Sequence, residues 1–429
     1  MQDTSFQRLT VLLLTIFLVL PISAAADDAL YLTAGSMIDT LNGETITDPV
    51  IEIRNDRIVS VTPGGSIPGG ARTIDLGNAT LLPGLADLHT HLTYSVTDFG
   101  YESLAVSDTD AAIRGVQNAR KTLLAGFTAA RNLGASGYAD VSLRNAIDDG
   151  RVPGPRLQVS GPSIGITGGH CDENRLPAEY DARSGGVADG PWAVRQKVRE
   201  NKKYGADVIK FCATGGVLSK GTNPGARQYT LEEMQAIVDE AHRLGMQVAA
   251  HAHGTEGILF AIRAGVDSVE HTSLMDDEGM RLARRNGTFL SVNAYTPVYM
   301  LASGEEAGML PESLEKARNL AEKRFATYRR LIAAGARIVY GSDSGTYPHG
   351  DNAKQFSVYV DLGMTPLQAI RSATTVAAES LGWAGDIGAI APGYFADIIA
   401  VEGNPLDDVS VLQNVSFVMK GGKVHKMAP

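Results

Sequence analysis

Short apolar runs in this chain repeatedly end in a side chain that can bind a metal ion. Six such side chains occur in the order His-x-His, Lys, His, His, Asp, and they are His89, His91, Lys210, His251, His271 and Asp343. Strand-type runs that alternate with helical segments build a parallel barrel whose strand ends converge on one face. The pattern therefore predicts that all six side chains meet on one rim of such a barrel.

The middle of the chain contains eight strand-type runs separated by helical patterns. The runs cover residues 79–89, 126–134, 156–164, 206–214, 247–253, 267–273, 288–296 and 337–343. One of the helical patterns begins with a capping box of Thr230 and Glu233 and ends at Gly245. Eight successive strand and helix units predict an α/β protein with a (β/α)₈ TIM-like barrel.

Both ends of the chain have a β-rich pattern. The stretches ALYLTAG and VIEIRNDRIVSV precede the barrel pattern, and ADIIAVEG and VSFVMKGGKV follow it. Chain termini often lie close together, so the two ends are expected to form one small β-sandwich domain. The predicted order is a signal peptide at 1–26, β-sandwich at 27–78, the barrel with the metal ligands at 79–386 and the rest of the sandwich at 387–429.

The first 26 residues have the pattern of a secretory signal. Arg8 precedes the apolar run Leu12–Leu20, Pro21 ends that run, and small residues follow. A membrane anchor is the alternative, but the run is short against the ~20 apolar residues that span a bilayer. The sequence thus predicts export to the periplasm or the medium, with no membrane span after cleavage.

Composition limits the partners and the cysteine chemistry. The formal net charge of −10 argues against a nucleic-acid partner, which would need a basic face. The only two cysteines are Cys171 and Cys212, and Cys212 lies two residues after Lys210. We expect two free, partly buried thiols, while export would permit a disulfide as the alternative.

Lys210 is the least usual of the six side chains. It could be a surface lysine at a strand end, or a buried amine paired with a carboxylate, because an unpaired buried ammonium is costly. A lysine amine with a lowered pKa can also react with CO₂ to give a carbamate, an anion able to bridge two metals. Because five other candidate metal ligands occur in the same pattern, we favour the carbamate.

The remaining ligands follow from strand geometry. Residues two apart on a strand share a face, so His89 and His91 can hold one metal. His251 and His253 also share a face; we assign His251 to the metal and His253 to a hydrogen bond with the substrate, with the opposite assignment left open. Glu270 should face away from His271 and support the structure. Asp343 could be a helix cap, or metal ligand and general base together.

The motifs carrying these residues resemble those of the amidohydrolase superfamily, in its binuclear form with a carboxylated lysine. LLPGLADLHTHL, ADVIKFCATGGVLSKGTNPGARQYTLEEM, VAAHAHGTEG and GSDSGTYPHGDNAKQF are similar to the branch of imidazolonepropionase-like proteins and Xaa-Pro dipeptidase-like carboxypeptidases, and ochratoxin-hydrolysing amidases share the pattern. Asn132 and Gln355 depart from it, where aspartate and glutamate are frequent.

The resemblance implies two divalent metals, taken as zinc, at a binuclear centre. His89 and His91 would bind the more buried metal, His251 and His271 the more exposed one. Lys210, carboxylated by CO₂, would bridge them. Asp343 would complete the buried site. The resemblance also implies a homo-oligomer.

The expected activity is hydrolysis of an amide or peptide bond next to a free carboxylate, by attack of a metal-bridging hydroxide. Substrates would be dipeptides, including Xaa-Pro, or N-acyl amino acids such as ochratoxin A. Asp343 and His253 are the catalytic candidates. The candidates for substrate binding are His170, Lys220, Arg227 and Tyr229. Alternatives are a cyclic-amide hydrolase of imidazolonepropionase type, a lactone or ester hydrolase, and a non-enzymatic metal-binding scaffold.

Overall fold

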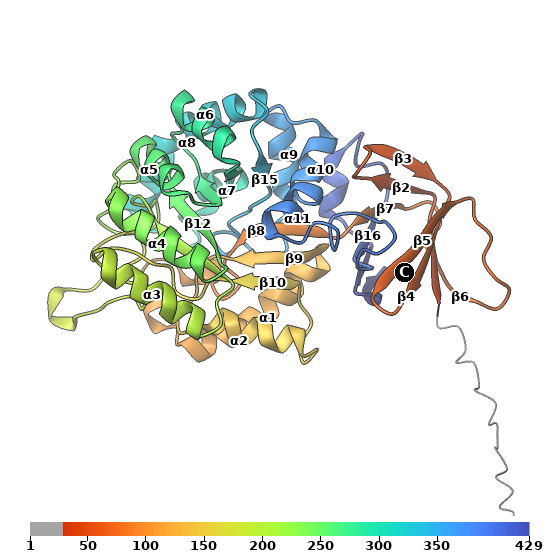
Figure 1. Cartoon of the computed structure of the whole chain (residues 1–429), viewed down its shortest axis with the longest axis horizontal. Helices are drawn as coiled ribbons and strands as arrows, with labels where there is room; N and C mark the ends of the chain where they lie inside the picture. The colour runs from red at the N-terminus through yellow and green to blue at the C-terminus, as the bar shows by residue number, and fades with distance from the viewer. Residues whose placement is uncertain (1–28, 429) are drawn as a thin grey trace, which may run out of the picture.

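The structure, a computed structural model, describes residues 29–428 and shows an α/β region beside a β-rich region (Figure 1). The predicted signal peptide lies outside the described residues. No helix in the described part of the chain is long and apolar enough to cross a membrane.

The α/β region is built on parallel strands that occupy the expected runs. They are β8 (Leu85–Thr90), β9 (Phe127–Asn132), β10 (Arg156–Val159), β11 (Val208–Cys212), β12 (Gln247–Ala252), β13 (Ser268–His271), β14 (Phe289–Ser291) and β15 (Ile338–Val339). Their order is β10-β9-β8 in one sheet and β11-β12-β13-β14-β15 in a second. All pairings within both sheets are parallel, so their carboxyl ends share one side.

Backbone hydrogen bonds also cross both gaps between these sheets. Beyond β10, Ile164 N donates to Lys210 O at 2.8 Å and Cys212 N donates to Ile164 O at 2.9 Å. On the other side, Leu88 N donates to Tyr340 O at 2.8 Å and Asp343 N donates to His89 O at 2.7 Å. These contacts bring Lys210, His89 and Asp343 to the same end of the strands.

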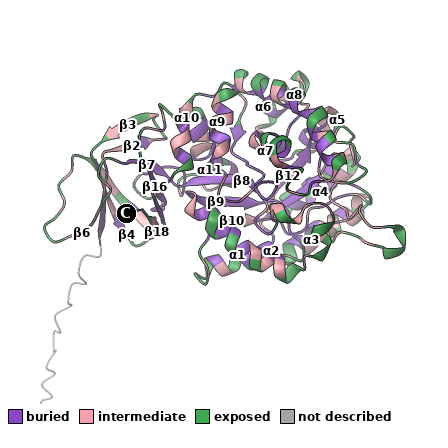
Figure 2. Ribbon diagram, turned by 180° about the vertical axis from the view of Figure 1, so that it is seen from behind, coloured by how far each residue is buried: buried purple, intermediate pink, exposed green. Residues whose placement is uncertain are grey.

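Helices surround these strands. They are α1 (Asp108–Leu124), α2 (Ala139–Asp148), α3 (Pro191–Lys203), α4 (Leu231–Arg243), α5 (Thr255–Ala264), α6 (Asp277–Asn286), α7 (Tyr295–Ser303), α8 (Pro311–Ala333), α9 (Lys354–Asp361), α10 (Pro366–Ser372) and α11 (Thr375–Leu381). The strands are buried and the outer helix surfaces are exposed (Figure 2). The predicted capping box is confirmed at α4, where Glu233 N donates to Thr230 Oγ1 and Thr230 N to Glu233 Oε2.

The β-rich region takes strands from both chain ends. They are β1 (Leu30–Thr33), β2 (Ser36–Asp39), β3 (Glu44–Thr47), β4 (Pro49–Arg54), β5 (Arg57–Pro63), β6 (Arg72–Asp75), β7 (Thr80–Pro83), β16 (Ile398–Val401), β17 (Phe417–Lys420) and β18 (Lys423–Met427). The sheet orders are β5-β4-β1-β6 and β18-β17-β16-β7-β2-β3. Leu32, Ile51, Leu81, Ile398 and Met419 meet in one core and are at most 1% exposed.

The expected run at 79–89 is in fact two strands. β7 pairs with β2 and β16 in the β-rich region, whereas β8 begins at Leu85 in the α/β region. Gly84 separates them, and a Cβ there would lie 2.1 Å from Thr128 Oγ1. The chain passes too close to β9 for a side chain at this crossing.

The two cysteines form a disulfide, so the expectation of free thiols was wrong. Cys171 and Cys212 are bonded, with their Cα atoms 6.1 Å apart, a normal separation for a bridge. The loop after β10 turns back over β11, and a Cβ on Gly165 would touch Cys171 Cβ. The bridge therefore ties this loop, and His170 with it, to the strand that carries Lys210.

Candidate metal centre

Two groups of donor atoms lie at the carboxyl ends of the strands. One group contains His89, His91 and Asp343, the other His251, His253 and His271, and the donor atoms within each lie within 4.8 Å of one another. The two groups are adjacent, because the ring centroids of His89 and His271 are 5.0 Å apart. The two groups thus contain five of the six side chains that the sequence selected, together with His253.

The chemistry of these donors fits divalent metal ions. Burial is the main reason that the pKa of His251, His253 and His271 lies well below the usual value. Burial raises the pKa of Asp343, but its interactions with His89, His91 and Lys210 outweigh burial and lower the pKa below its usual value. Neutral imidazoles beside an ionised carboxylate are the ligand set that zinc and similar ions prefer.

Lys210 lies next to the first group, beside His89. It is 3% exposed, and its Nζ is 3.3 Å from His89 Nε2. Among the residues that the structure describes, no carboxylate lies within ion-pair distance of this amine. Burial lowers its pKa to about 8. Both ordinary interpretations, the surface lysine and the paired buried amine, are therefore wrong.

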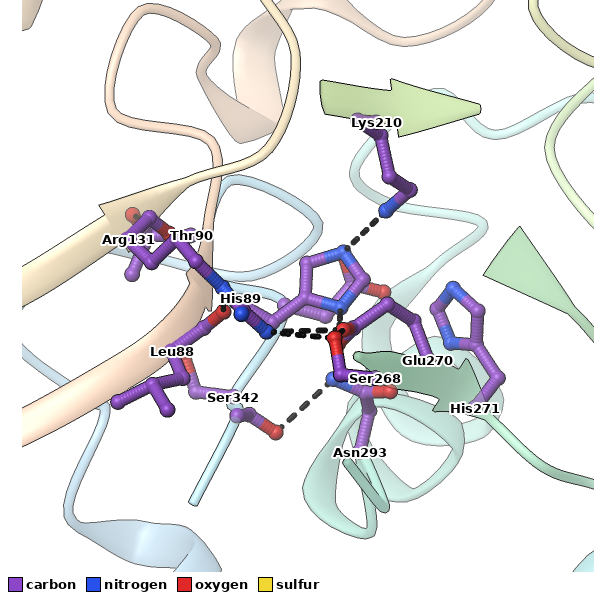
Figure 3. A network of polar contacts seen from close by, with 12 residues as sticks. Leu88, His89, Thr90, Arg131, Lys210, Ser268, Glu270, His271, Asn293 and Ser342 are labelled. Carbon is purple, nitrogen blue, oxygen red and sulfur yellow. Dashed lines mark hydrogen bonds and ion pairs between the residues drawn. The ribbon is translucent and has the colours of Figure 1, made fainter. Parts of the chain in front are cut away.

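His89 is oriented from behind by a buried charge pair (Figure 3). Its Nδ1 lies 2.9 Å from Glu270 Oε2, and Glu270 Oε1 accepts hydrogen bonds from Arg131 Nη2 at 2.9 Å and Ser268 Oγ at 2.6 Å. Burial raises the pKa of Glu270, but Arg131 and His89 more than reverse this, so the carboxylate is ionised. His89 thus donates through Nδ1, which leaves the Nε2 lone pair for a metal.

The sequence interpretation missed Arg131 and misplaced Glu270. Glu270 does support the structure, but it points towards His89 rather than away from the site. Side chains stop alternating between the two faces of the strand at this point, because His271 has φ 73° and Thr272 has φ 48°, both in the left-handed region. Asp343, at φ 64°, makes a similar turn. Such backbone is costly away from glycine and gathers at functional sites.

Replacing Glu270 with glutamine should weaken both metal binding and the fold. The amide leaves Arg131 buried without a counter-charge, which should cost about 3 kcal/mol of the free energy of unfolding. Loss of the support behind His89 should lower metal affinity by roughly 10- to 100-fold. Chelator competition and urea unfolding measure the two effects. Glu278→Gln, at an exposed pair with Arg263, is the control; unchanged metal affinity in Glu270→Gln would contradict this role.

Hydrogen bonds also set the roles of His251 and His253. His251 Nε2 lies 3.2 Å from Gly215 O, which can only accept, so Nδ1 keeps the free lone pair. His253 Nδ1 lies 3.2 Å from Arg324 Nη2. A guanidinium can only donate, so His253 Nδ1 accepts and Nε2 carries the proton. This favours His251 as the ligand and His253 as a hydrogen-bond donor.

The segment that carries Asp343 is fastened to β8 by Asp87. Asp87 Oδ1 accepts from Ser342 N at 2.9 Å, and Oδ2 accepts from Asn352 Nδ2 at 2.7 Å. Burial raises the pKa of Asp87 to about 6. The sequence analysis missed this residue, although a charged side chain within LADLH was a signal.

The predicted substrate-binding residues divide into two sets. His170 lies at the metal centre, with its ring centroid 4.2 Å from that of His251 and its Nδ1 2.8 Å from Ser219 Oγ. Lys220 lies on the surface, where Nζ donates to Tyr101 OH at 3.1 Å.

Arg227 and Tyr229 are directed elsewhere. Arg227 donates to Tyr229 O at 2.6 Å and pairs with Glu256 at 3.2 Å. Tyr229 is fully buried in the core, and its OH donates to Ala188 O at 2.7 Å. Its placement at the substrate was wrong, because the chain turns inward there to begin α4.

The two departures from the expected motifs have structural roles. Asn132 Oδ1 accepts from Leu92 N at 2.7 Å, just after the His-x-His pair. Gln355 Nε2 donates to Gly341 O at 3.0 Å and its Oε1 accepts from Tyr295 N at 3.3 Å. Each amide holds a backbone segment that leads into the site.

Comparisons with known proteins agree on one family. A family model described as "Amidohydrolase family" matches residues 80–425. Ochratoxinase of Aspergillus niger is 37% identical over 371 residues, covering 81% of this chain and 75% of that protein. A solved structure of a Xaa-Pro dipeptidase with bound methionine in the active site has a TM-score of 0.86 and 36% identity, covering 93% of this chain and 100% of that one. The structure of A. niger ochratoxinase has a TM-score of 0.82 and 34% identity, covering 93% and 96%.

Proposed function

The chain belongs to the amidohydrolase family, and from this premise we propose that it cleaves an amide or peptide bond next to a free carboxylate at a binuclear metal centre. It is a hydrolase of amide bonds. The finer assignment is supported by two adjacent donor groups and by the buried Lys210 beside His89. Similar proteins include an ochratoxinase and a Xaa-Pro dipeptidase, and the peptide bond that a dipeptidase cleaves lies next to a free carboxylate.

The proposed centre holds two divalent metals, which we take to be zinc. His89, His91 and Asp343 would hold one, and His251 and His271 the other. Such metals lower the pKa of water and polarise a carbonyl group. Lys210 would bridge them as a carbamate, formed when its neutral amine adds to CO₂ and releases a proton. The lowered pKa of Lys210 supports this, because only the neutral amine reacts.

The protein's own groups would orient the substrate and move the proton. His253 Nε2–H would donate to the scissile carbonyl oxygen and stabilise the negative charge that develops there. Asp343 would accept the proton of the attacking water and deliver it to the leaving nitrogen. Closely placed acceptor and donor groups of this kind leave the substrate little freedom, which itself lowers the barrier.

The proposed architecture is a closed (β/α)₈ barrel that begins at β8, after Gly84, and runs to about residue 386, with a β-sandwich from 29–83 and 387–428. The hydrogen bonds from Leu88 to Tyr340 and from Ile164 to Lys210 support closure. We also propose export, which the Cys171–Cys212 disulfide supports because such bonds persist in oxidising compartments. Amino-terminal sequencing of secreted protein would locate the cleavage site.

The assay that tests this function measures amino-acid release by purified, zinc-loaded protein. The panel contains Xaa-Pro dipeptides, other dipeptides, N-acyl-phenylalanines including ochratoxin A, and a C-terminally amidated dipeptide. The expected result is fast release from substrates with a free carboxylate and much slower release from the amidated one. Metal-stripped protein is the control. Absence of release from every substrate, with two metals bound, would overturn the proposed substrate class.

A further inference from the structure

α8 places a buried arginine over the second donor group. Arg324 is 4% exposed and its guanidinium reaches the ends of β12 and β13. One turn later on the same helix, Tyr328 OH donates to His271 O at 2.8 Å. α8 therefore contacts the residues around the site through two successive turns.

The guanidinium of Arg324 has no counter-charge. Its Nε donates to Ser273 Oγ at 2.9 Å and its Nη2 to His253 Nδ1 at 3.2 Å, and both acceptors are neutral. Within residues 29–428, no carboxylate forms an ion pair with Arg324, and its Nη1 atom has no hydrogen-bond partner. Nη1 is not fully buried, so it remains accessible.

A second buried arginine among the described residues shows how unusual this is. Arg131 is 1% exposed, and Glu270 Oε1 lies 2.9 Å from its Nη2. A buried cation without an anion is costly, so proteins usually pair it. We therefore expect a bound anion to supply the negative charge that Arg324 lacks.

We propose that Arg324 binds the free carboxylate of the substrate. This rests on the proposed function and adds the residue that recognises the leaving amino acid. His253 Nε2–H marks the position of the scissile carbonyl, and Arg324 contacts the opposite edge of the same ring. The substrate carboxylate lies one residue beyond the scissile bond, a step of about 3.8 Å. Nη1, the guanidinium nitrogen without a hydrogen-bond partner in the described residues, is the atom that would reach this carboxylate.

The surroundings strengthen this contact. Leu320, one turn before Arg324 on α8, lies in an apolar cluster with Val217 and Leu274. A charge-assisted hydrogen bond in such apolar surroundings is stronger than one in water. The other candidate cations are already occupied, Lys220 by Tyr101 at the surface and Arg227 by Glu256.

The test compares binding of L-phenylalanine with that of L-phenylalaninamide, and of L-proline with L-prolinamide, by calorimetry on zinc-loaded protein. We expect the wild type to prefer each carboxylate by about 100-fold, a usual value for a buried charge-assisted contact. Arg324→Met should reduce the preference below threefold, and Arg324→Lys should retain part of it. Arg330→Met, at an exposed position on α8 paired with Asp277, should leave it unchanged. Metal content and thermal melting are recorded for each variant.

Turnover separates carboxylate binding from a role in holding His253. Loss of the Arg324 carboxylate contact should raise KM for dipeptides and leave the slow cleavage of an amidated dipeptide unchanged. An equal loss of kcat on both substrates would assign Arg324 to positioning His253 and overturn the proposal. A wild type without carboxylate preference, or an Arg324→Met variant that keeps it, would also overturn it.

The calorimetric test needs no catalysis, so the two proposals can fail separately. Carboxylate binding that depends on Arg324 in a protein that cleaves no panel substrate would remove the proposed function alone. If the protein cleaves its substrates normally and Arg324→Met keeps the carboxylate preference, only the Arg324 proposal is contradicted.

Discussion

Asp343→Asn is expected to lower kcat by about 10³-fold to 10⁴-fold, the contribution of an effective general base and acid. The side chain keeps its shape and one oxygen ligand, so most metal should stay bound. Its amide cannot take the proton of the attacking water, and no other carboxylate of the described residues belongs to either donor group. Amino-acid release gives kcat, and elemental analysis gives the metal content.

Asp351→Asn is a suitable control for this variant. Asp351 lies in the same loop, where it pairs with Lys354 at 2.8 Å on the surface. It should leave both turnover and metal content unaltered. Near-normal turnover in Asp343→Asn would refute the proton-transfer role, while a loss of metal equal to the loss of turnover would reduce Asp343 to a ligand.

Lys210→Met should have an equally large effect, but through metal binding. Methionine fills the buried space without supplying an anion, so the two donor groups would face each other with no bridging charge. We expect turnover to fall by at least about 10³-fold, and bound metal to fall below two ions per chain. Elemental analysis and amino-acid release measure both in one preparation.

A smaller substitution at the same position tests the carbamate itself. Lys210→Ala leaves room beside His89, and added formate or propionate can supply the carboxylate that the lysine no longer carries. Partial recovery of metal binding and turnover in Lys210→Ala, with none in Lys210→Met, is the expected pattern. Two bound metals and normal turnover in Lys210→Met would show that no bridging anion is needed.

Sequence periodicity predicted the positions of the strands and the convergence of the ligands. Parallel strands present their carboxyl ends on one side, so a ligand at the end of each run, such as His271, must approach the others. The spacing of apolar residues could not predict where side chains stop alternating between the two faces of a strand. The left-handed backbone at His271 lets this residue reach the site although its neighbour Glu270 also points there, and a pattern of apolar residues contains no sign of this.

Loop contacts were the least predictable part. Tyr229 follows a glycine-rich loop without periodicity, so its burial depends on where the chain turns to begin α4. The Cys171–Cys212 bond depends on the loop after β10 folding back over β11. Arg324 lies in an ordinary amphipathic helix, and only the packing of α8 against β12 and β13 reveals that its charge is buried and unpaired.

The pairing of β7 with β16 constrains how the protein can be made. Residues 80–83 leave the ribosome early, but residues 398–401, their partner strand, are among the last of 429. Until then one edge of β7 has no neighbour, and open strand edges invite pairing with other chains. The intervening α/β region, whose contacts join sequential strands, can form first. Completion of the β-rich sheet therefore requires β16, and a chain that lacks this strand leaves one edge of β7 unpaired.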